Sequence, residues 1–309
     1  QTATAVRKFS PDIFITVDAP DFSSRVARQL KGSDFPKVHY VAPSVWAWRP
    51  GRAKKIAGLY DHLLTLLPFE PPYFEAVGLS ADFVGHSVIE SGADKGDGPA
   101  FRARHGIKPD ERLLMLLPGS RRGEVTRHLP VFKEAVEKLR SDIGAFRIVT
   151  PVIGRAGVIV REEVANWDTS VLVVDGEDEK YDAMAAADLA LAASGTVALE
   201  LGLARLPTVI AYRMNAITSW IARRAVKLDY VNLVNILMGK EVVPEHILEN
   251  CTADNLSNAL AELFRSEEKR HQQIVSYGEA MVMLGEGGEA PGVRAAGIIM
   301  ELIARNRTT

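Results

Sequence analysis

Short apolar runs alternate with amphipathic stretches along the whole chain. The first part of the chain contains four apolar runs that predict strands, at 12–17, 38–41, 62–67 and 81–84. Five more follow, at 113–117, 146–150, 171–174, 189–192 and 208–212. Runs that are continuous in Val, Ile and Leu are typical of strands buried on both faces, as in parallel sheets with helices between the strands. The pattern therefore predicts an α/β protein with two doubly wound domains in tandem.

The residues between and after these runs predict helices and one linker. We expect helices at 1–10, 22–30, 52–57, 72–77, 129–139, 194–203 and 293–305. The stretch 91–99 is rich in Gly and Asp and has no apolar period, which is typical of a linker. We therefore place a first domain at 1–98, a second domain at 99–285 and a C-terminal helical segment at 286–309.

Length, charge and cysteine content narrow the class of protein. A chain of 309 residues is long enough for two domains of ordinary size. Its formal net charge of −2 gives no general support for nucleic-acid binding. The one cysteine, Cys251, excludes an intrachain disulfide and favours a reducing compartment. No apolar run reaches the ~18 residues of a membrane span, and because the chain begins at Gln1 we expect a natural N-terminus further upstream.

Residues at strand ends are the first candidates for chemistry, because ligands of doubly wound domains bind beyond the carboxyl ends of the strands. Asp18 and Asp21 follow the first predicted strand. A carboxylate in this place can act as a general base, or it can cap the helix that follows. We assign Asp21 to the cap and predict that Asp18 is catalytic.

The turn after the first strand of the second half contains Gly119, Ser120 and Arg121. A Gly-Ser turn can leave backbone N–H groups free to face an anion, and an arginine beside it can bind phosphate oxygens with two nitrogens. Glu124 is spaced to pair with Arg121 and hold it in place. The alternative is a plain turn between strand and helix with solvated arginines.

A second anion site is predicted at Ser194, Gly195 and Thr196, which precede an apolar helix. Small hydroxyl residues at a helix start present unpaired N–H groups and a positive dipole end to a phosphate. Glu200 lies one helical turn after Thr196 and can accept hydrogen bonds from ribose hydroxyls. The alternative is a helix cap together with a core glutamate that is paired elsewhere.

An aromatic and basic segment follows the second predicted strand. It contains Trp46, Trp48 and Arg49 and continues into a basic helix at 52–57. Such a segment suits contact with lipid headgroups and acyl chains, but it also suits an aromatic loop that packs on the sheet. From the residues alone we prefer packing. His86, after the fourth predicted strand, can either donate to a ligand or cap its turn.

These segments together resemble the lipid-A-disaccharide synthase family of glycosyltransferases, which have the GT-B fold. The matching stretches occur in the family's order and lie at 17–22, 39–49, 67–70, 84–86, 116–121, 193–200 and 229–231, with Asn235. The run Pro-Ser-Val-Trp-Ala-Trp-Arg at 43–49 is the most specific of them. The resemblance implies two Rossmann-like domains that face a cleft, and a C-terminal helix that crosses back to the first domain.

The resemblance also implies a reaction. The family joins UDP-linked 2,3-diacylglucosamine to 2,3-diacylglucosamine 1-phosphate (lipid X), which gives lipid A disaccharide 1-phosphate and UDP with inversion. Asp18 and Arg121 match residues that the family needs for activity. The UDP-binding region matches Gly119, Ser120, Ser194, Gly195, Thr196 and Glu200, and we extend it to Tyr212 and Asn235. No cofactor and no metal are implied.

Acylated substrates change the interpretation of the aromatic segment. Because the enzyme must meet lipids, Trp46, Trp48, Arg49 and His86 become candidates for contact with the acceptor or the membrane. The resemblance implies a cytoplasmic enzyme of a Gram-negative bacterium that associates peripherally with the inner face of the inner membrane. A homodimer is compatible with it, and nucleic acid is not expected as a partner.

Two alternatives remain open from the sequence. A nucleotide-sugar epimerase can have the same fold, although it has no use for an aromatic lipid loop. The family normally begins with a Gly-Glu-Ala-Ser-Gly-Asp segment that this chain lacks, so the second alternative is a truncated chain that binds UDP without turnover.

Overall fold

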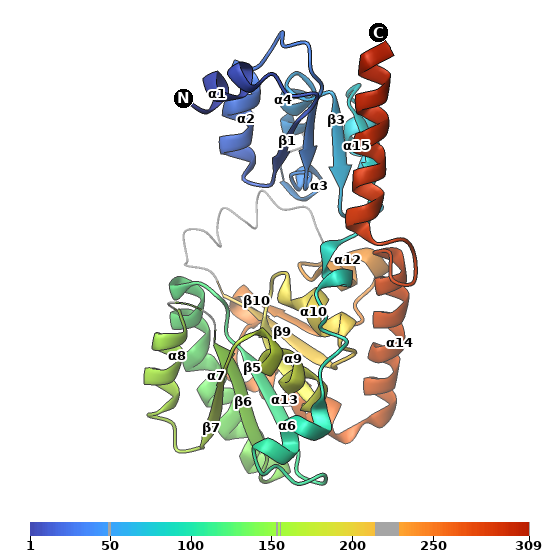
Figure 1. Ribbon diagram of the computed structural model, residues 1–309. Coiled ribbons are helices and arrows are strands. Elements are labelled where there is room, and N and C mark those ends of the chain that lie inside the picture. The colour runs from blue at the N-terminus through green and yellow to red at the C-terminus, as the bar shows by residue number, and fades with distance from the viewer. Residues whose placement is uncertain (49–50, 153, 155, 214–228, 309) are drawn as a thin grey trace. The chain divides into compact units, whose positions relative to one another are not determined.

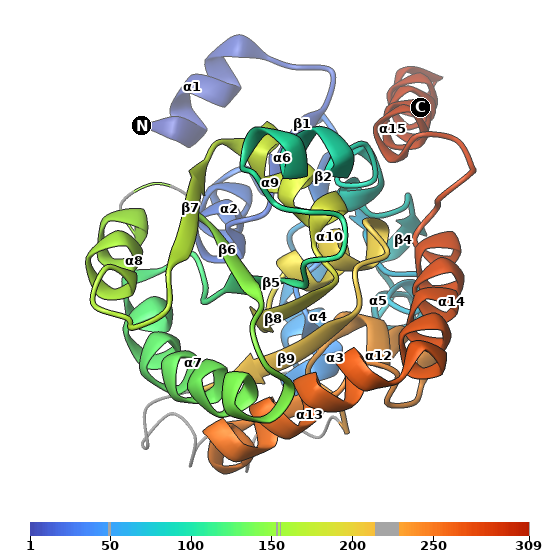
Figure 2. The same ribbon diagram turned by 90° about the horizontal axis from the view of Figure 1, so that it is seen from below.

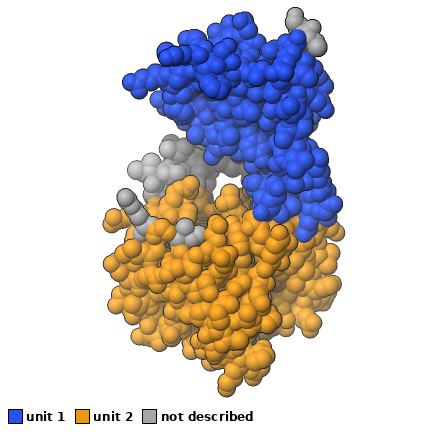
Figure 3. Space-filling view, in the orientation of Figure 1, with its two compact units in different colours: residues 1–90, 225–227, 282–309 blue, residues 91–224, 228–281 orange. Residues whose placement is uncertain are grey.

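The computed structural model describes residues 1–308 apart from 49–50, 153, 155 and 214–228. Within the described ranges, backbone contacts divide the chain into two units, 1–90 with 282–308 and 91–213 with 229–281 (Figure 3). Residues 91–99, which the sequence suggested as a linker, group with the second unit. The reason is close packing, because a Cβ atom on Gly96 would lie 2.0 Å from the backbone oxygen of Tyr181.

The first unit is built on a four-stranded parallel sheet in the order β1-β2-β3-β4. The strands are β1 (Phe14–Val17), β2 (Lys37–Tyr40), β3 (His62–Thr65) and β4 (Ser80–Phe83). Its helices are α1 (Thr2–Phe9), α2 (Pro20–Gln29), α3 (Val45–Trp48), α4 (Gly51–Ala57), α5 (Pro71–Glu75) and α15 (Pro291–Thr308), with a 3-10 turn η1 (Ser87–Glu90). Each strand follows its spatial neighbour in sequence, so the sheet is wound in one direction.

Alternate side chains of β3 supply two separate cores on the faces of this sheet. Leu63 is buried in a cluster that includes residues of α4 and α5. Leu64 faces the opposite side and is buried in a second cluster with Ala295 of α15. Ile298 and Leu302 of the same helix also pack against this cluster. The last helix of the chain therefore returns to the first unit and covers the second face of its sheet (Figure 1).

The second unit has a six-stranded parallel sheet in the order β10-β9-β8-β5-β6-β7. The strands are β5 (Leu113–Leu117), β6 (Arg147–Val152), β7 (Val171–Asp175), β8 (Leu189–Ala193), β9 (Thr208–Tyr212) and β10 (Glu245–Ile247). The helices are α6 (Gly98–Arg104), α7 (Arg122–Ile143), α8 (Ala156–Val164), α9 (Glu177–Ala186), α10 (Val197–Leu203), α12 (Leu233–Met238), α13 (Ala253–Arg265) and α14 (Glu267–Met283), with a 3-10 turn η2 (Leu248–Asn250). The order reverses between β5 and β8, which is the switch point where doubly wound sheets bind ligands.

Helices cover both faces of the second sheet. On one face Leu114 and Leu116 pack with residues of α7 and α13, including Phe132 and Leu260. Figure 2 shows α7 and α13 on one side of the strands and α9 and α10 on the other. All five residues of β5 and of β8 are buried as a result, which explains their continuous apolar sequences. The predicted α/β class with two parallel-sheet domains is confirmed.

The starts of two predicted helices differ most from the structure. The helix expected at 129–139 runs from Arg122 to Ile143, because buried positions recur at Val125, His128 and Phe132 through its polar first turns. The helix expected at 194–203 begins only at Val197. The acidic segment after β7 forms the first turn of α9. Acidic side chains there suit the positive end of the helix dipole.

The described helices do not meet the requirements of a membrane span. None of them combines the length and the apolar character needed to cross a bilayer.

Candidate active site

A pocket of about 490 Å³ lies in the second unit, at the carboxyl ends of β5, β6 and β8. The turns after β5 and β8 line it, together with side chains from α8, α9 and α10. Seven residues predicted from the sequence line this one pocket: Gly119, Ser120, Arg121, Ser194, Gly195, Thr196 and Glu200. The two segments lie far apart in sequence and meet here because β5 and β8 are neighbours in the sheet.

The turn after β5 is organised by Glu124. Its carboxylate accepts hydrogen bonds from the backbone N–H groups of Ser120 at 3.2 Å and Arg121 at 3.3 Å. The same carboxylate pairs with the Arg121 guanidinium at 2.9 Å, which confirms the predicted pair. The expectation that these turn amides are free for a ligand is wrong, because a protein carboxylate already occupies them.

Gly119 is required by this arrangement. Its φ of +117° lies in the region that favours glycine, and a Cβ atom would lie 2.7 Å from the Cβ of Glu124. Burial by itself would raise the pKa of Glu124, but hydrogen bonds from Arg121 and from the two backbone amides outweigh burial and lower it. Glu124 therefore stays anionic and acts as a fixed counter-charge in the turn.

Arg121 keeps most of its guanidinium available. Its side chain is 82% exposed although one nitrogen contacts Glu124. The remaining N–H donors of this planar group point to no other described residue, so they can bind an anion in the pocket. This geometry fits the predicted contact with phosphate oxygens.

The turn after β8 offers free backbone donors. The N–H of Ser194 is used, because it donates to the carbonyl of Ala211 at 3.1 Å. Among the described residues, no hydrogen bond involves the N–H groups of Gly195, Thr196 or Val197. Gly195 and Thr196 are exposed at the pocket. This turn therefore has free backbone amides of the kind an anion site needs, whereas two amides of the turn after β5 are occupied by Glu124.

Glu200 projects from α10 into the same pocket and is paired with a residue that the sequence reasoning missed. Its carboxylate lies 2.6 Å from the ammonium of Lys180 on α9. Lys180 is 5% exposed and also lines the pocket. The sequence does contain a pattern that places Lys180 on a buried helix face, because Lys180, Ala183 and Met184 recur at helical spacing in α9.

Tyr212 and Asn235, the other two predicted donor-site residues, do not line the pocket. Asn235 is fully buried, and its amide oxygen accepts from the N–H groups of Val242 and Val243. Its amide nitrogen donates to the carbonyl of Val243 and to Glu245. Asn235 therefore organises the segment before β10.

In the first unit, Asp18 lies at the carboxyl end of β1 and is exposed. Asp18 and Ala19 both have left-handed backbones, with φ of 47° and 43°. Two consecutive non-glycine residues in this region cost about 1–3 kcal/mol each, and such strain is often found at functional sites. The turn is held by the Ser23 hydroxyl, which donates to the Asp18 carbonyl at 2.8 Å.

Asp21 has another role than the one expected. The residue at the N-cap of α2 is Ala19, and no side chain caps this helix. Asp21 lies in the first turn and pairs with Arg52 of α4 at 2.7 Å. The cap assigned to Asp21 is therefore wrong, and Pro20 at the first helical position replaces it as the start signal.

Trp46 is held by its own domain. Its indole N–H donates to Glu70 at 3.0 Å, and its ring packs edge-on against Phe69 at 5.1 Å. The Glu70 carboxylate also accepts from the N–H groups of Leu66 and Leu67. Trp48 ends helix α3, and Arg49 lies outside the described residues. For Trp46 the packing interpretation holds.

His86 caps a turn. Its Nδ1 accepts from the N–H of Val88 at 3.0 Å, at the start of η1. The backbone N–H of His86 donates to the carbonyl of Leu284 at 2.9 Å. Burial lowers the pKa of His86 to about 4, so the ring is neutral near pH 7.

Sequence comparison decides the family. A family model described as lipid-A-disaccharide synthetase matches residues 1–287. The lipid-A-disaccharide synthase of Rhodospirillum centenum is 49% identical, over 99% of this chain and 77% of that protein. That of Paramagnetospirillum magneticum is 44% identical, over 99% of this chain and 80% of that protein. The chain belongs to the lipid-A-disaccharide synthetase family.

Solved structures agree on the fold. A UDP-N-acetylglucosamine 2-epimerase from Neisseria meningitidis matches with a TM-score of 0.63 at 12% identity, over 97% of this chain and 79% of that one. A glycosyltransferase from Rickettsia africae matches with a TM-score of 0.61 at 11% identity, over 98% of this chain and 79% of that one. Epimerases and transferases share this fold, so the family and not the fold favours the transferase. The expected glycosyltransferase that forms the lipid A disaccharide is confirmed.

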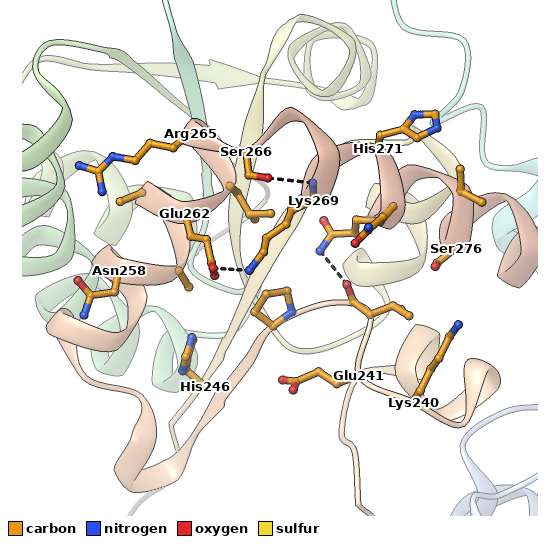
Figure 4. Close-up of a pocket in the computed structure, with 18 of the residues that line it drawn as sticks. Lys240, Glu241, His246, Asn258, Glu262, Arg265, Ser266, Lys269, His271 and Ser276 are labelled. Carbon is orange, nitrogen blue, oxygen red and sulfur yellow. Dashed lines mark hydrogen bonds and ion pairs between the residues drawn. The ribbon is translucent and has the colours of Figure 1, made fainter.

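The second unit also contains a wider hollow of about 1330 Å³ between β10, α13 and α14 (Figure 4). Glu262 of α13 pairs with Lys269 of α14, and Gln273 donates to the carbonyl of Val242. None of the predicted site residues lines this hollow. The smaller pocket at the strand ends is therefore the candidate active site.

His128 joins two strand ends beneath that pocket. The ring is fully buried, with Nδ1 donating to the carbonyl of Pro118 at 2.9 Å and Nε2 accepting from the N–H of Arg213 at 3.0 Å. Only the neutral ring can do both. Burial is the main reason why the pKa of His128 is lowered from its ordinary value of 6.5. His128 therefore anchors the turn that carries Gly119 and Arg121.

We expect the stabilisation from His128 to depend on pH. The pKa is lower in the folded state, so the unfolded chain binds the proton first as pH falls below about 6.5. In urea unfolding, His128→Leu should lower the free energy of unfolding by about 1–3 kcal/mol at pH 7.5. The difference from wild type should shrink toward pH 5, by at most about 1.4 kcal/mol per pH unit.

The exposed histidine of α14 provides the control for this measurement. His271 is exposed, and His271→Leu should leave the free energy of unfolding at pH 7.5 close to that of wild type. A His128→Leu difference that stays constant over this range would contradict the neutral, doubly bonded ring.

Proposed function

We propose that this chain transfers 2,3-diacylglucosamine from its UDP derivative to the 6-hydroxyl of 2,3-diacylglucosamine 1-phosphate, and so forms lipid A disaccharide 1-phosphate and UDP. The observation that carries this proposal is the pocket of the second unit. There, exposed N–H groups of Gly195 and Thr196, the Arg121 guanidinium and the Glu200 carboxylate converge within one cavity. The Neisseria epimerase of related fold was solved with UDP-GlcNAc bound, which supports a nucleotide-sugar ligand.

The parts of the donor suit different groups of the pocket. The diphosphate suits the free amides after β8 and the exposed guanidinium of Arg121, since both offer N–H donors to an anion. The ribose hydroxyls suit the carboxylate of Glu200. When the sugar–phosphate bond breaks, negative charge grows on UDP, and Arg121 stabilises it.

Asp18 is proposed as the general base. In a single inverting displacement, the acceptor 6-hydroxyl attacks the anomeric carbon, UDP leaves, and the hydroxyl proton passes to a carboxylate. Asp18 is exposed at a strand end and held there by a strained turn. A base needs both a fixed position and access to substrate, and this residue has both within its own unit.

Replacing Asp18 by Asn should test the base. We expect kcat to fall roughly 100-fold or more, because general-base catalysis contributes about 10²–10⁴. The Kd of UDP should stay within about twofold, because Asp18 belongs to the unit that does not contain the donor pocket. Rates are measured as disaccharide formed, and UDP binding by calorimetry.

Asp34→Asn, an exposed aspartate of the same unit, should keep the wild-type rate. If Asp18→Asn turns over at a near-normal rate while Asp34→Asn does too, Asp18 is not the base.

Replacing Arg121 by Ala should test whether this side chain binds the diphosphate of the donor. We expect kcat/KM for the UDP donor to fall about 10- to 100-fold, which corresponds to about 1.4–2.7 kcal/mol lost at the diphosphate. The adjacent Arg122 is also exposed and contacts no carboxylate among the described residues, so Arg122→Ala is the matched control. Equal donor kinetics in the two variants would remove the phosphate role from Arg121.

Association with the inner face of the inner membrane belongs to the same proposal, because both substrates carry acyl chains. Within the first unit, α4 buries Ala53 and Ile56 and exposes Lys54 and Lys55. A basic face beside the aromatic helix α3 suits anionic headgroups. A homodimer remains a prediction.

Sedimentation with vesicles tests the membrane proposal. We expect the chain to sediment with vesicles of anionic phospholipid, and less so at 0.5 M salt, because salt screens surface charges. The double variant Lys54→Glu/Lys55→Glu should bind several-fold more weakly, while Lys31→Glu, exposed after α2, should bind like wild type. Protein that stays in the supernatant with anionic vesicles at low salt would refute this part.

A further inference from the structure

Lys180 is the buried cation of the candidate active site, and no role has yet been given to it. It is 5% exposed, and its side chain projects from α9 toward α10. The ammonium lies 2.6 Å from the Glu200 carboxylate, a distance typical of a short charge-assisted contact. Both residues line the pocket. The pair therefore belongs to the binding surface and not to a remote part of the core.

Glu200 needs such a partner. It lies in the apolar helix Val197–Leu203, where four neighbouring residues are almost completely buried, Ala198, Leu199, Leu201 and Leu203. The Glu200 side chain is only 21% exposed. A carboxylate in such surroundings is costly unless a cation or hydrogen bonds compensate it. Among the described residues, Lys180 is the one cation that lies within ion-pair distance of it.

Lys180 is mounted on a rigid element. Helix α9 packs so closely on α6 that Cβ atoms on Gly96 and Gly98 would lie 2.0 and 2.4 Å from its backbone oxygens. Arg104 of α6 also pairs with Asp182 of α9 at 2.6 Å. A lysine side chain is usually flexible. The conformational freedom of this one is restricted, because its side chain is buried and its helix is held by α6. The position of its ammonium is therefore set by the fold.

We infer that Lys180 is a positioning residue that holds the Glu200 carboxylate toward the ribose hydroxyls of the donor, and thereby makes the site prefer ribose over deoxyribose. This inference rests on the proposed function, in which Glu200 binds the ribose. Lys180 acts through Glu200: its ammonium holds one side of the carboxylate, and the other lone pairs remain for the hydroxyls. A carboxylate free to rotate would bind the hydroxyls less well.

The test compares the affinity of UDP with those of 2′-deoxy-UDP and 3′-deoxy-UDP by calorimetry. For wild type we expect UDP to bind roughly tenfold or more tightly than at least one deoxy analogue, since a hydrogen bond to a charged group is lost. In Lys180→Met this ratio should fall by about threefold or more. In Lys180→Arg, which keeps a cation at this place, most of the ratio should remain.

The ratio separates a positioning role from a merely structural one. If Lys180 only supported the fold, Lys180→Met would weaken all three ligands equally and leave the ratio unchanged, which would overturn the inference. A wild-type ratio near 1 would overturn it as well. If wild type does not bind UDP at all, the donor site itself is wrong and the proposed function falls first.

Two further variants cover the case in which Lys180→Met does not fold. Glu200→Gln should lose the ribose preference with Lys180 intact. Lys180→Met/Glu200→Gln, which leaves no unpaired charge in the pocket, should show the same ratio as Glu200→Gln. A lower ratio in the double variant would show that Lys180 acts apart from Glu200 and would refute the inference. Lys133→Met on α7, outside the pocket, should match wild type.

Discussion

Strands covered on both faces can carry polar chemistry only at their ends, and this constraint shapes the second unit. All residues of β5 and β8 are buried, so no charged side chain can lie within these strands without a partner. Polar and charged residues lie instead in the turns where the strands end. Gly119 to Arg121 follow β5, and Ser194 to Thr196 follow β8. Because these strands are neighbours, the two turns share one pocket.

Within that pocket, two carboxylates are paired and several N–H donors are not. Glu124 holds its own turn and one end of Arg121, while Glu200 is held by Lys180. Among the described residues, the amides after β8 and the outer part of the Arg121 guanidinium remain without an acceptor. A diphosphate complements these donors, and a ribose complements the remaining lone pairs of Glu200. These groups are what the proposed nucleotide ligand requires of the pocket.

In the first unit, too, the sheet is covered on both faces and polar residues lie at the strand ends. Its sheet is covered by α4 and α5 on one face and by α15 on the other. The exposed end of β1 carries Asp18 in a strained turn, whereas the aromatic segment is tied inward by the contact between Trp46 and Glu70. The proposed base and the proposed lipid contact thus lie on different parts of the unit, and α4 presents its lysines to solvent.

The sequence by itself determined the α/β class, most strand positions and the two turns that meet in the pocket, because these follow from local periodicity and from the strand-end rule. The specific run at 43–49 supported the family. Only tertiary structure decided which amides are free, since that depends on where Glu124 and the carbonyl of Ala211 lie. It also placed Lys180 beside Glu200 and buried Asn235, which holds the segment before β10 by hydrogen bonds. These pairings join residues on different elements, so no local pattern contains them.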